Sequence, residues 1–212
     1  MPYKTTYKVL PGYTILLIIL SFFPFSAFGA LTSVQVFDKA KEKITSAKSL
    51  QADFSMSAQG QTIKGKIYAK GSKFSIISSS TSSWYNGKLL YTYDKGANET
   101  YLYSPSEKEL REVNPLVYLS SSSDYKITGK KEKTKGMESV ILIPQKARSG
   151  IKSIMIDIDT KNYTPTKIII NTSGGGTMIL NISNVKLDVN LGNATFEYPK
   201  SKYPNVSISD MR

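Results

Sequence analysis

The sequence contains no cysteine and no histidine among its 212 residues. The absence of cysteine excludes disulfides, thiol nucleophiles and thiolate metal ligands, and it makes an oxidising compartment harmless to the chain. The absence of histidine excludes imidazole bases and the commonest metal ligand. Acidic residues are also few, because 16 Asp and Glu stand against 28 Lys and Arg, for a formal net charge of +12. The composition therefore excludes several chemistries without indicating a function.

Long apolar runs are absent except at the N-terminus, where one predicts a secretory signal peptide. Two lysines precede residues 13–28, which are uncharged and mostly apolar, and small residues place a cleavage site after Gly29. A retained membrane anchor is the alternative, but serines and a proline interrupt the run, and it is short of the roughly 20 residues that a spanning helix needs. We expect an exported protein with a signal peptide over residues 1–29 and a single domain over residues 30–212, soluble once cleaved.

The remaining chain shows one helical pattern followed by many strand patterns. Apolar residues at helical spacing from Val34 to Ala47 predict an N-terminal amphipathic helix. From Leu50 onward apolar and polar residues alternate, with polar turns at hairpin intervals, and a slip of the alternation at Asn184 predicts a β-bulge. The pattern indicates about eleven short strands, and a twisted open sheet of that size should curl. We predict a mainly β fold built on an unclosed, strongly curved antiparallel sheet.

The segment from Ser104 to Ser123 does not fit the alternation. Asn114 and Pro115 are typical of a helix N-cap and first helical position, and residues 116–119 form a short apolar turn. One interpretation is a small helical lid inserted between hairpins. The other is a surface loop with a buried plug.

The sequence gives weak signals for catalysis. A Ser-Lys dyad is compatible with the composition, but no serine lies in a Gly-x-Ser-x-Gly setting, and the run from Ser78 to Ser83 favours a solvated hairpin loop. The glycines at 174–176 favour a hairpin turn over a phosphate-binding loop. Asp157 and Asp159 share a strand face, which favours a solvated surface over a Ca²⁺ or acid–base pair. We therefore expect no enzymatic activity, no metal and no cofactor.

Part of the surplus of basic residues is a cluster of lysines near one turn. Its members are Lys126, Lys130, Lys131, Lys133 and Lys135. Nucleic acid is disfavoured as a partner, because single-strand binding needs exposed aromatic residues among the basic ones. Acidic lipid headgroups or an acidic partner fit better, and the simplest interpretation is solubility alone.

Several short motifs, none diagnostic alone, follow one another in a recognisable order. They are SLQADF at 49–54, GKIYAK at 65–70, NGKLLYTYD at 86–94, NPL at 114–116, LIP at 142–144, ISNVK at 182–186 and FEYP at 196–199. In order and spacing the chain resembles the periplasmic outer-membrane lipoprotein carrier protein family (LolA-like), from about Val34 to Arg212. The resemblance implies a half-barrel sheet whose concave apolar face is covered by the N-terminal helix and a short helical lid.

The resemblance also implies a function. Family members carry the acyl chains of lipoproteins through the periplasm from the inner to the outer membrane. The implied partners are acylated lipoproteins, an inner-membrane ABC transporter complex as donor and a possible outer-membrane receptor lipoprotein, with the carrier itself a monomer that binds no nucleic acid. A general lipid-binding, amphiphile-binding or sensor module on the same scaffold is the alternative, and a lipid hydrolase is a third hypothesis.

The chain departs from the family at the end of its second strand. Many members have Lys-Arg-Pro there, and that arginine helps to hold the lid closed. This chain has Lys70, Gly71 and Ser72 instead. The departure concerns lid closure and leaves the predicted fold unchanged.

The expected ligand site is an apolar cleft on the dry face of the sheet. For each candidate, simple packing of sheet against helix is the alternative interpretation. The candidates are Phe54, Met56, Ile67, Phe74, Ile76, Tyr91, Tyr93, Tyr101, Tyr103, Ile156, Ile168, Ile170, Met178 and Leu180, with Leu116 and Leu119 from the lid.

Overall fold

The computed structural model describes residues 31–212, except 115, 121, 132–133 and 147–149. The expected signal peptide therefore lies outside the described residues. In the described part of the chain, no helix is both long enough and apolar enough to cross a membrane.

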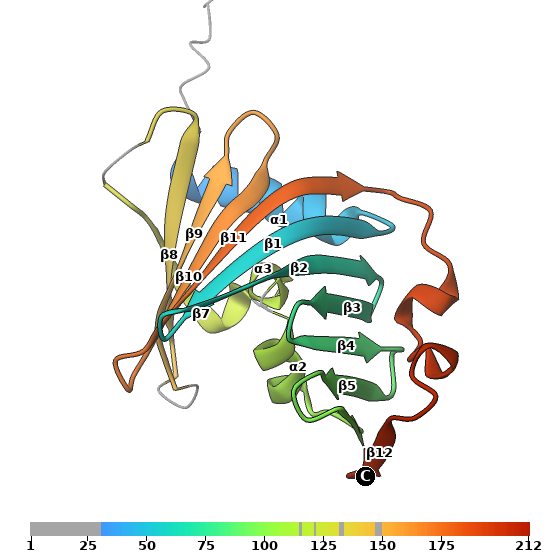
Figure 1. Ribbon diagram of the computed structural model, residues 1–212. Helices are drawn as coiled ribbons and strands as arrows, with labels where there is room; N and C mark the ends of the chain where they lie inside the picture. Colours follow the sequence, from blue (N-terminus) through green and yellow to red (C-terminus); the bar gives the residue numbers. More distant parts are fainter. Residues whose placement is uncertain (1–30, 115, 121, 132–133, 147–149) are drawn as a thin grey trace, which may run out of the picture. The chain divides into compact units, whose positions relative to one another are not determined.

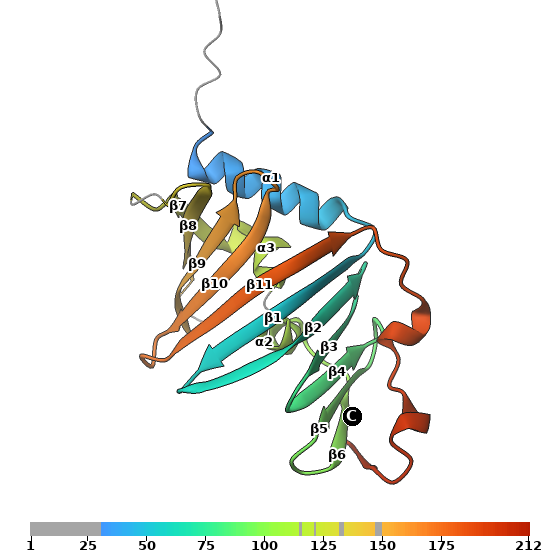
Figure 2. The ribbon, with the colours of Figure 1, turned by 45° about the horizontal axis from the view of Figure 1, so that its top comes forward.

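The described residues form one unclosed sheet in which twelve strands lie in the order β12-β6-β5-β4-β3-β2-β1-β11-β10-β9-β8-β7. The strands are β1 Leu50–Ala58, β2 Gln61–Lys70, β3 Lys73–Ser78, β4 Thr81–Tyr85, β5 Leu90–Asp94, β6 Glu99–Tyr103, β7 Tyr125–Gly129, β8 Met137–Pro144, β9 Ile151–Asp159, β10 Thr164–Thr172, β11 Thr177–Leu187 and β12 Ser207–Asp210. The strands change direction steeply across the sheet, which is strongly curved (Figures 1 and 2). The predicted mainly β, unclosed sheet is confirmed.

The sheet differs from the prediction at one edge. β12 pairs with β6 in parallel, with Ser207 opposite Glu99 and Asp210 opposite Leu102. All other strand pairs are antiparallel, so the sheet is mixed and has one strand more than the predicted eleven or so. A four-residue strand whose partner lies about a hundred residues earlier leaves no local pattern that would show its direction.

The N-terminal helix α1 (Ser33–Ser46) begins at a capping box, in which Thr32 and Gln35 exchange side-chain and backbone hydrogen bonds. It buries Val36, Phe37 and Ala40 in the main hydrophobic core, together with residues of β8, β9 and β10. The predicted amphipathic helix is confirmed. Its apolar stripe is buried against the same face of the sheet as the helices that follow β6.

The connection from β6 to β7 joins strands near opposite edges of the sheet and so crosses its concave face (Figure 1). It contains α2 (Glu107–Val113), α3 (Val117–Ser120) and a 3₁₀ turn, Ser122–Asp124. Asn114 ends α2, and its side-chain oxygen accepts a hydrogen bond from the backbone N–H of Leu116 at 3.2 Å. The short apolar turn expected at 116–119 is therefore present as α3, while Pro115 lies outside the described residues.

Helix α2 was not predicted, because its sequence EKELREV is highly charged and has no clear apolar stripe. The available signal was its capping box, in which Ser106 and Glu109 bond reciprocally to each other's backbone N–H. The topology explains why this connection lies over the sheet. The two meanders, β1–β6 and β7–β11, are joined along β1 and β11. Their far ends, β6 and β7, therefore lie near opposite edges of the sheet, and the chain that connects them must cross its face.

The predicted bulge in the last long strand is confirmed. Gln51 pairs with Lys186 but Asp53 pairs with Ser183, so β11 has one extra residue opposite β1. Asn184 has a positive φ of 52° there, and its side-chain amide donates a 2.7 Å hydrogen bond to Asp53. Beyond the bulge β11 remains paired with β1, although the alternation of apolar and polar residues in β11 has shifted by one position.

The prediction of a solvated loop over residues 78–83 is wrong. Ser78 ends β3, and β4 begins at Thr81 after a two-residue turn. Ser82 and Ser83 are buried, with 1% and 7% of their surface exposed. Because β4 lies between β3 and β5, its small side chains pack against neighbours on both strands, which overrides the usual preference of serine for loops.

Candidate functional site

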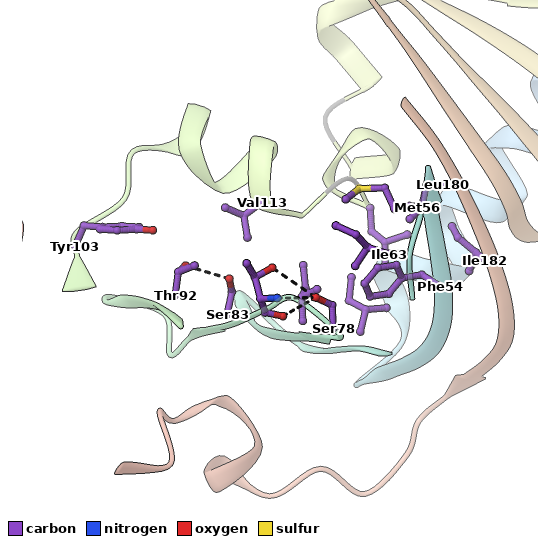
Figure 3. Close-up of a pocket in the computed structure, with 14 residues that line it drawn as sticks. Phe54, Met56, Ile63, Ser78, Ser83, Thr92, Tyr103, Val113, Leu180 and Ile182 are labelled. Atoms are coloured by element: carbon purple, nitrogen blue, oxygen red, sulfur yellow. Dashed lines mark hydrogen bonds between the residues drawn. The ribbon is translucent and has the colours of Figure 1, made fainter. Parts of the chain in front are cut away.

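A mostly apolar cavity of about 280 Å³ lies between the concave face of the sheet and the helical connection (Figure 3). Val113 of α2 and Leu116 contribute to its wall from the connection. The other lining residues come from the sheet; they are Phe54, Met56, Ile63, Ile67, Ile76, Ser78, Thr81, Ser83, Thr92, Tyr103, Leu180 and Ile182.

Strand register places the apolar part of this lining in two rows. Phe54 pairs with Ile182, and Met56 pairs with Leu180 and Ile63. Side chains directly opposite each other on paired strands share a face, so these rows form a continuous apolar wall. Figure 3 shows Met56, Leu180, Phe54 and Ile182 gathered at one end of the cavity.

The opposite end of the cavity carries hydroxyl groups. Ser83 and Thr92 are hydrogen-bonded across β4 and β5 at 3.0 Å. The Ser78 hydroxyl donates to the carbonyl oxygen of Thr81 at 2.6 Å and so closes the β3–β4 turn. The cavity thus has an apolar end over β1 and β11 and a hydroxyl-lined end over β3, β4 and β5.

A second cavity of about 360 Å³ lies on the other side of Leu116. It is bounded by the end of α1, the ends of β1–β3, α2 and α3. Its apolar lining residues are Ile44, Ala47, Leu50, Ala69, Phe74, Leu110, Leu116 and Leu119. Leu116 borders both cavities, so its side chain separates them.

A profile of the family described as outer membrane lipoprotein carrier protein LolA matches residues 24–189. The chain belongs to this family. The match covers most of the chain, and it confirms the resemblance inferred from the short motifs. No curated protein matches the sequence.

Solved structures that resemble this LolA-family chain are distant from it in sequence. An uncharacterized conserved protein from Thermus thermophilus is 15% identical, with a TM-score of 0.56 over 84% of this chain and 99% of that chain. A putative outer membrane lipoprotein-sorting protein domain from Vibrio parahaemolyticus is 13% identical, with a TM-score of 0.44 over 79% of this chain and 96% of that chain. At such identity the first likeness shows the fold alone.

The expected cleft residues of this LolA-family chain do not all lie in one place. Phe54, Met56, Ile67, Ile76, Tyr103, Leu116 and Leu180 line the first cavity. Phe74 and Leu119 line the second, with Leu116 between the two. Ile156, Ile168 and Ile170 are buried in the core that α1 covers, Met178 packs against that core, and Tyr101 donates a hydrogen bond to Glu99.

Tyr91 and Tyr93 lie on the opposite face of the sheet, contrary to the expectation that they face the cleft. Tyr91 stacks on Tyr198 with ring centroids 5.2 Å apart, and the ring of Tyr93 lies 4.5 Å from that of Tyr203. Thr92, between them, points into the cavity instead. The C-terminal segment covers this outer face, so its large aromatic residues are shielded from water as well. Because both faces of these strands carry shielded residues, alternation alone could not distinguish the two faces.

Three apolar cavity residues were missing from the expected set. Ile63 and Ile182 share the period-two face of Ile67 and Leu180, so the same alternation could have included them. Val113 belongs to the unpredicted helix α2. The hydroxyl residues were missed because a polar residue in an alternating strand is normally assigned to the wet face.

The groups considered for catalysis or metal binding in the sequence make structural contacts in the described residues. Lys95 donates a 2.9 Å hydrogen bond to the backbone carbonyl of Ser78, not to its hydroxyl. Asp157 accepts a 2.6 Å hydrogen bond from Ser139, and Asp159 accepts two backbone N–H bonds in the turn that follows it. In the part of the chain that the structure describes, no group of three or more acidic side chains could hold a metal ion.

Proposed function

We propose that this chain is a periplasmic carrier that holds the acyl chains of lipoproteins beneath α2 and α3 and moves them from the inner to the outer membrane. The apolar cavity beneath a crossover connection is the observation that supports the proposal most directly. Family membership supports it independently. Every CH₂ group removed from water contributes about 0.8 kcal/mol, so even a small apolar cavity favours an acyl chain strongly.

A carrier must also release its cargo, and the two helices of the connection differ in a way that suits this requirement. In α3, Leu119 is fully buried, and Tyr118 is nearly so and packs edge-on against Tyr125. In α2, Leu110 and Val113 remain only half-buried. We infer that α3 is the anchor and that α2 is the part that moves when a ligand enters.

The present cavity volume is consistent with a closed state. Ligand pockets typically enclose about 300–1,000 Å³, and neither cavity here is large on that scale. In the proposed mechanism, movement of α2 with Leu116 joins the two cavities into one longer apolar site. The apolar area exposed on opening is then covered by the ligand, so the two states differ little in free energy.

The missing family arginine fits the same mechanism. Gly71 has a positive φ of 58° in the turn between β2 and β3, and Lys70 donates to the backbone carbonyl of Leu191 at 2.9 Å. Among the described residues, this hydrogen bond of Lys70 goes to the C-terminal segment and not to the lid. We propose that the apolar contacts of the buried Leu116 contribute to closure in this chain.

The donor and acceptor of the cargo belong to the proposal as well. An inner-membrane ABC transporter complex and an outer-membrane receptor lipoprotein are the partners that the family resemblance implies. Lys126, Lys131 and Lys135 are exposed on the edge strand β7 and the turn that follows it, where an acidic partner or lipid headgroup could approach.

The decisive experiment is native mass spectrometry of the mature chain, purified from periplasm without detergent and incubated with a triacylated lipopeptide. A one-to-one complex is expected. A cavity-filling variant, Leu180→Trp, should lose the complex, whereas Ile143→Trp should keep it, because Ile143 is 45% exposed and lies outside both cavities. Binding of phospholipid in preference to lipopeptide would indicate a general lipid-binding module, and an apo mass throughout would exclude the carrier function.

A further inference from the structure

The hydroxyl-lined end of the first cavity is unusual for a site that only shields hydrocarbon. Ser78 and Ser83 are both only 7% exposed, although each has a polar oxygen. Burying a hydroxyl costs free energy unless it is hydrogen-bonded, and alanine or valine would fill these positions without that cost. Figure 3 shows Ser83 beside Thr92 at the end of the cavity away from Leu180, with Ser78 between Ser83 and Phe54.

The hydrogen bonds at this end leave donors available. A hydroxyl carries a single proton, so the Ser83–Thr92 bond uses one of the pair's two protons. The Ser78 proton is used on the Thr81 carbonyl, and the Thr81 hydroxyl lies 3.5 Å from the Ser78 oxygen, at the limit of a hydrogen bond. One proton of the Ser83–Thr92 pair, and that of Thr81, can therefore be donated to a ligand.

These donors indicate what the ligand must offer. Free hydroxyl protons in a mostly apolar cavity are best matched by acceptor oxygens that carry no proton of their own, and an ester carbonyl is such a group. The distribution of the lining then fixes an orientation, with hydrocarbon against Met56 and Leu180 and oxygen against Ser83 and Thr92.

We propose that the free proton of the Ser83–Thr92 pair binds an ester carbonyl oxygen at the polar end of a diacylglyceryl ligand, while its acyl chains extend toward β1 and β11. The inference rests on the proposed function, because it names the ligand class and orientation of the same cavity. It makes the pair a specificity element that distinguishes ester-linked acyl chains from ether-linked alkyl chains of equal length.

A matched pair of ligands tests this assignment. A diacylglyceryl lipopeptide and its dialkyl ether analogue differ only in the carbonyl oxygens, and their dissociation constants can be measured by displacement of a fluorescent fatty acid. The intact chain should bind the ester about 3- to 10-fold more tightly, the range that one net hydrogen bond gives. A phosphatidylglycerol ester and its ether analogue form a second arm, which distinguishes lipoprotein from phospholipid as the source of the ester.

The variant to compare is Ser83→Ala with Thr92→Val, which removes both hydroxyls and keeps the volume of residue 92. Its preference for the ester should fall to about 1-fold, with little change in affinity for the ether. The chain offers a control of the same kind, because Ser57 and Thr62 form a cross-strand hydroxyl pair at 2.9 Å that is exposed and lies outside the cavities. Ser57→Ala with Thr62→Val should keep the full preference.

The outcomes separate the inference from the proposed function. If the intact chain binds ester and ether equally, or if the Ser83→Ala, Thr92→Val variant keeps the preference, the assignment of the hydroxyl pair is wrong while lipid binding stands. If neither ligand of either arm binds the intact chain, the proposed function fails and the inference fails with it. Loss of ester preference in the cavity variant alone supports the assignment.

Discussion

Phe54 and Gly65 lie opposite each other on β1 and β2, and the ring of Phe54 occupies the space that a side chain at position 65 would need. A Cβ atom built on Gly65 would lie 2.8 Å from Cε1 of Phe54 and 2.2 Å from the backbone oxygen of Ile77. The glycine thus allows the aromatic ring of Phe54, part of the cavity wall, to lie over the backbone of position 65. A residue without a side chain is therefore needed at position 65 for Phe54 to keep its place in the cavity wall.

Replacing Gly65 by alanine should therefore destabilise the fold and disturb the cavity. The new methyl group meets backbone of β3 as well as the Phe54 ring, so β3 or the ring must move. We expect the free energy of unfolding to fall by about 1–3 kcal/mol, as measured by urea denaturation, with weaker lipid binding. Gly174→Ala is the control, because nothing lies within 4 Å of its Cβ position. Equal effects of the two substitutions would contradict this explanation.

The helix α1, the long strands and the bulge at Asn184 could be predicted because each leaves a local pattern. A strand with one dry face alternates with period two, and a change of phase within it has few explanations other than an extra residue. The same reasoning identified Phe54, Met56 and Leu180 as neighbours of one surface. Those predictions needed no knowledge of what lies on that surface.

The parts that could not be predicted depend on which segment covers which face. Tyr91 and Tyr93 alternate as regularly as any cavity residue, but the tail carrying Tyr198 and Tyr203 covers their side of the sheet. That contact joins residues about a hundred positions apart, and the alternation of residues within one strand carries no information about it. The buried hydroxyl of Ser83 is the converse case, because a polar residue on a dry face contradicts the rule on which the prediction relied.

The ring of Tyr198 should be the main attachment of the C-terminal segment. It stacks between Tyr91 and Tyr203, at 5.2 and 5.6 Å, and its oxygen accepts a 3.0 Å hydrogen bond from the fully buried Thr100. Tyr198→Ala should lower the free energy of unfolding by about 2–4 kcal/mol, and Tyr198→Phe by about 1 kcal/mol, because the latter keeps the rings and loses only the acceptor. Lipid affinity should be unchanged in both, since the cavity is on the other face. Urea denaturation and lipid displacement measure the two quantities separately.

The capping box of α2 should control the opening of the lid. Ser106→Ala removes the acceptor for the backbone N–H of Glu109, a change that costs a helix about 1 kcal/mol. Because the core is untouched, we expect faster hydrogen exchange over Glu107–Val113 and faster lipid release, with a smaller change in global stability. Ser104→Ala, an exposed serine two residues earlier, should change none of these. If hydrogen exchange over α2 becomes faster but lipid release does not, then opening of α2 is not the step that releases the lipid.

The attachment of β12 should depend on pH through Glu99. Tyr101 donates a 2.9 Å hydrogen bond to one carboxylate oxygen of Glu99, and Ser209 of β12 donates to the other. These bonds, that of Ser209 first, lower the pKa of Glu99 below its ordinary value of 4.5. A carboxyl group whose pKa is lower in the folded state stabilises the fold at pH values above its unfolded pKa. That stabilisation is lost as the pH falls from 4.5 through the folded pKa.

Glu99→Gln removes this titration, so the difference in unfolding free energy between the intact chain and the variant should be largest near pH ~6 and should shrink toward pH ~3. Urea denaturation across that range measures the difference. Arg212 lowers the pKa of Asp210, in the same strand, to about 2, and because Asp210 is present in both chains its own pH dependence cancels in the difference. Glu42→Gln, on the exposed face of α1, provides a control for the loss of one negative charge. A difference that stays constant over the whole range would mean that the bonds to Ser209 and Tyr101 do not depend on the charge of Glu99.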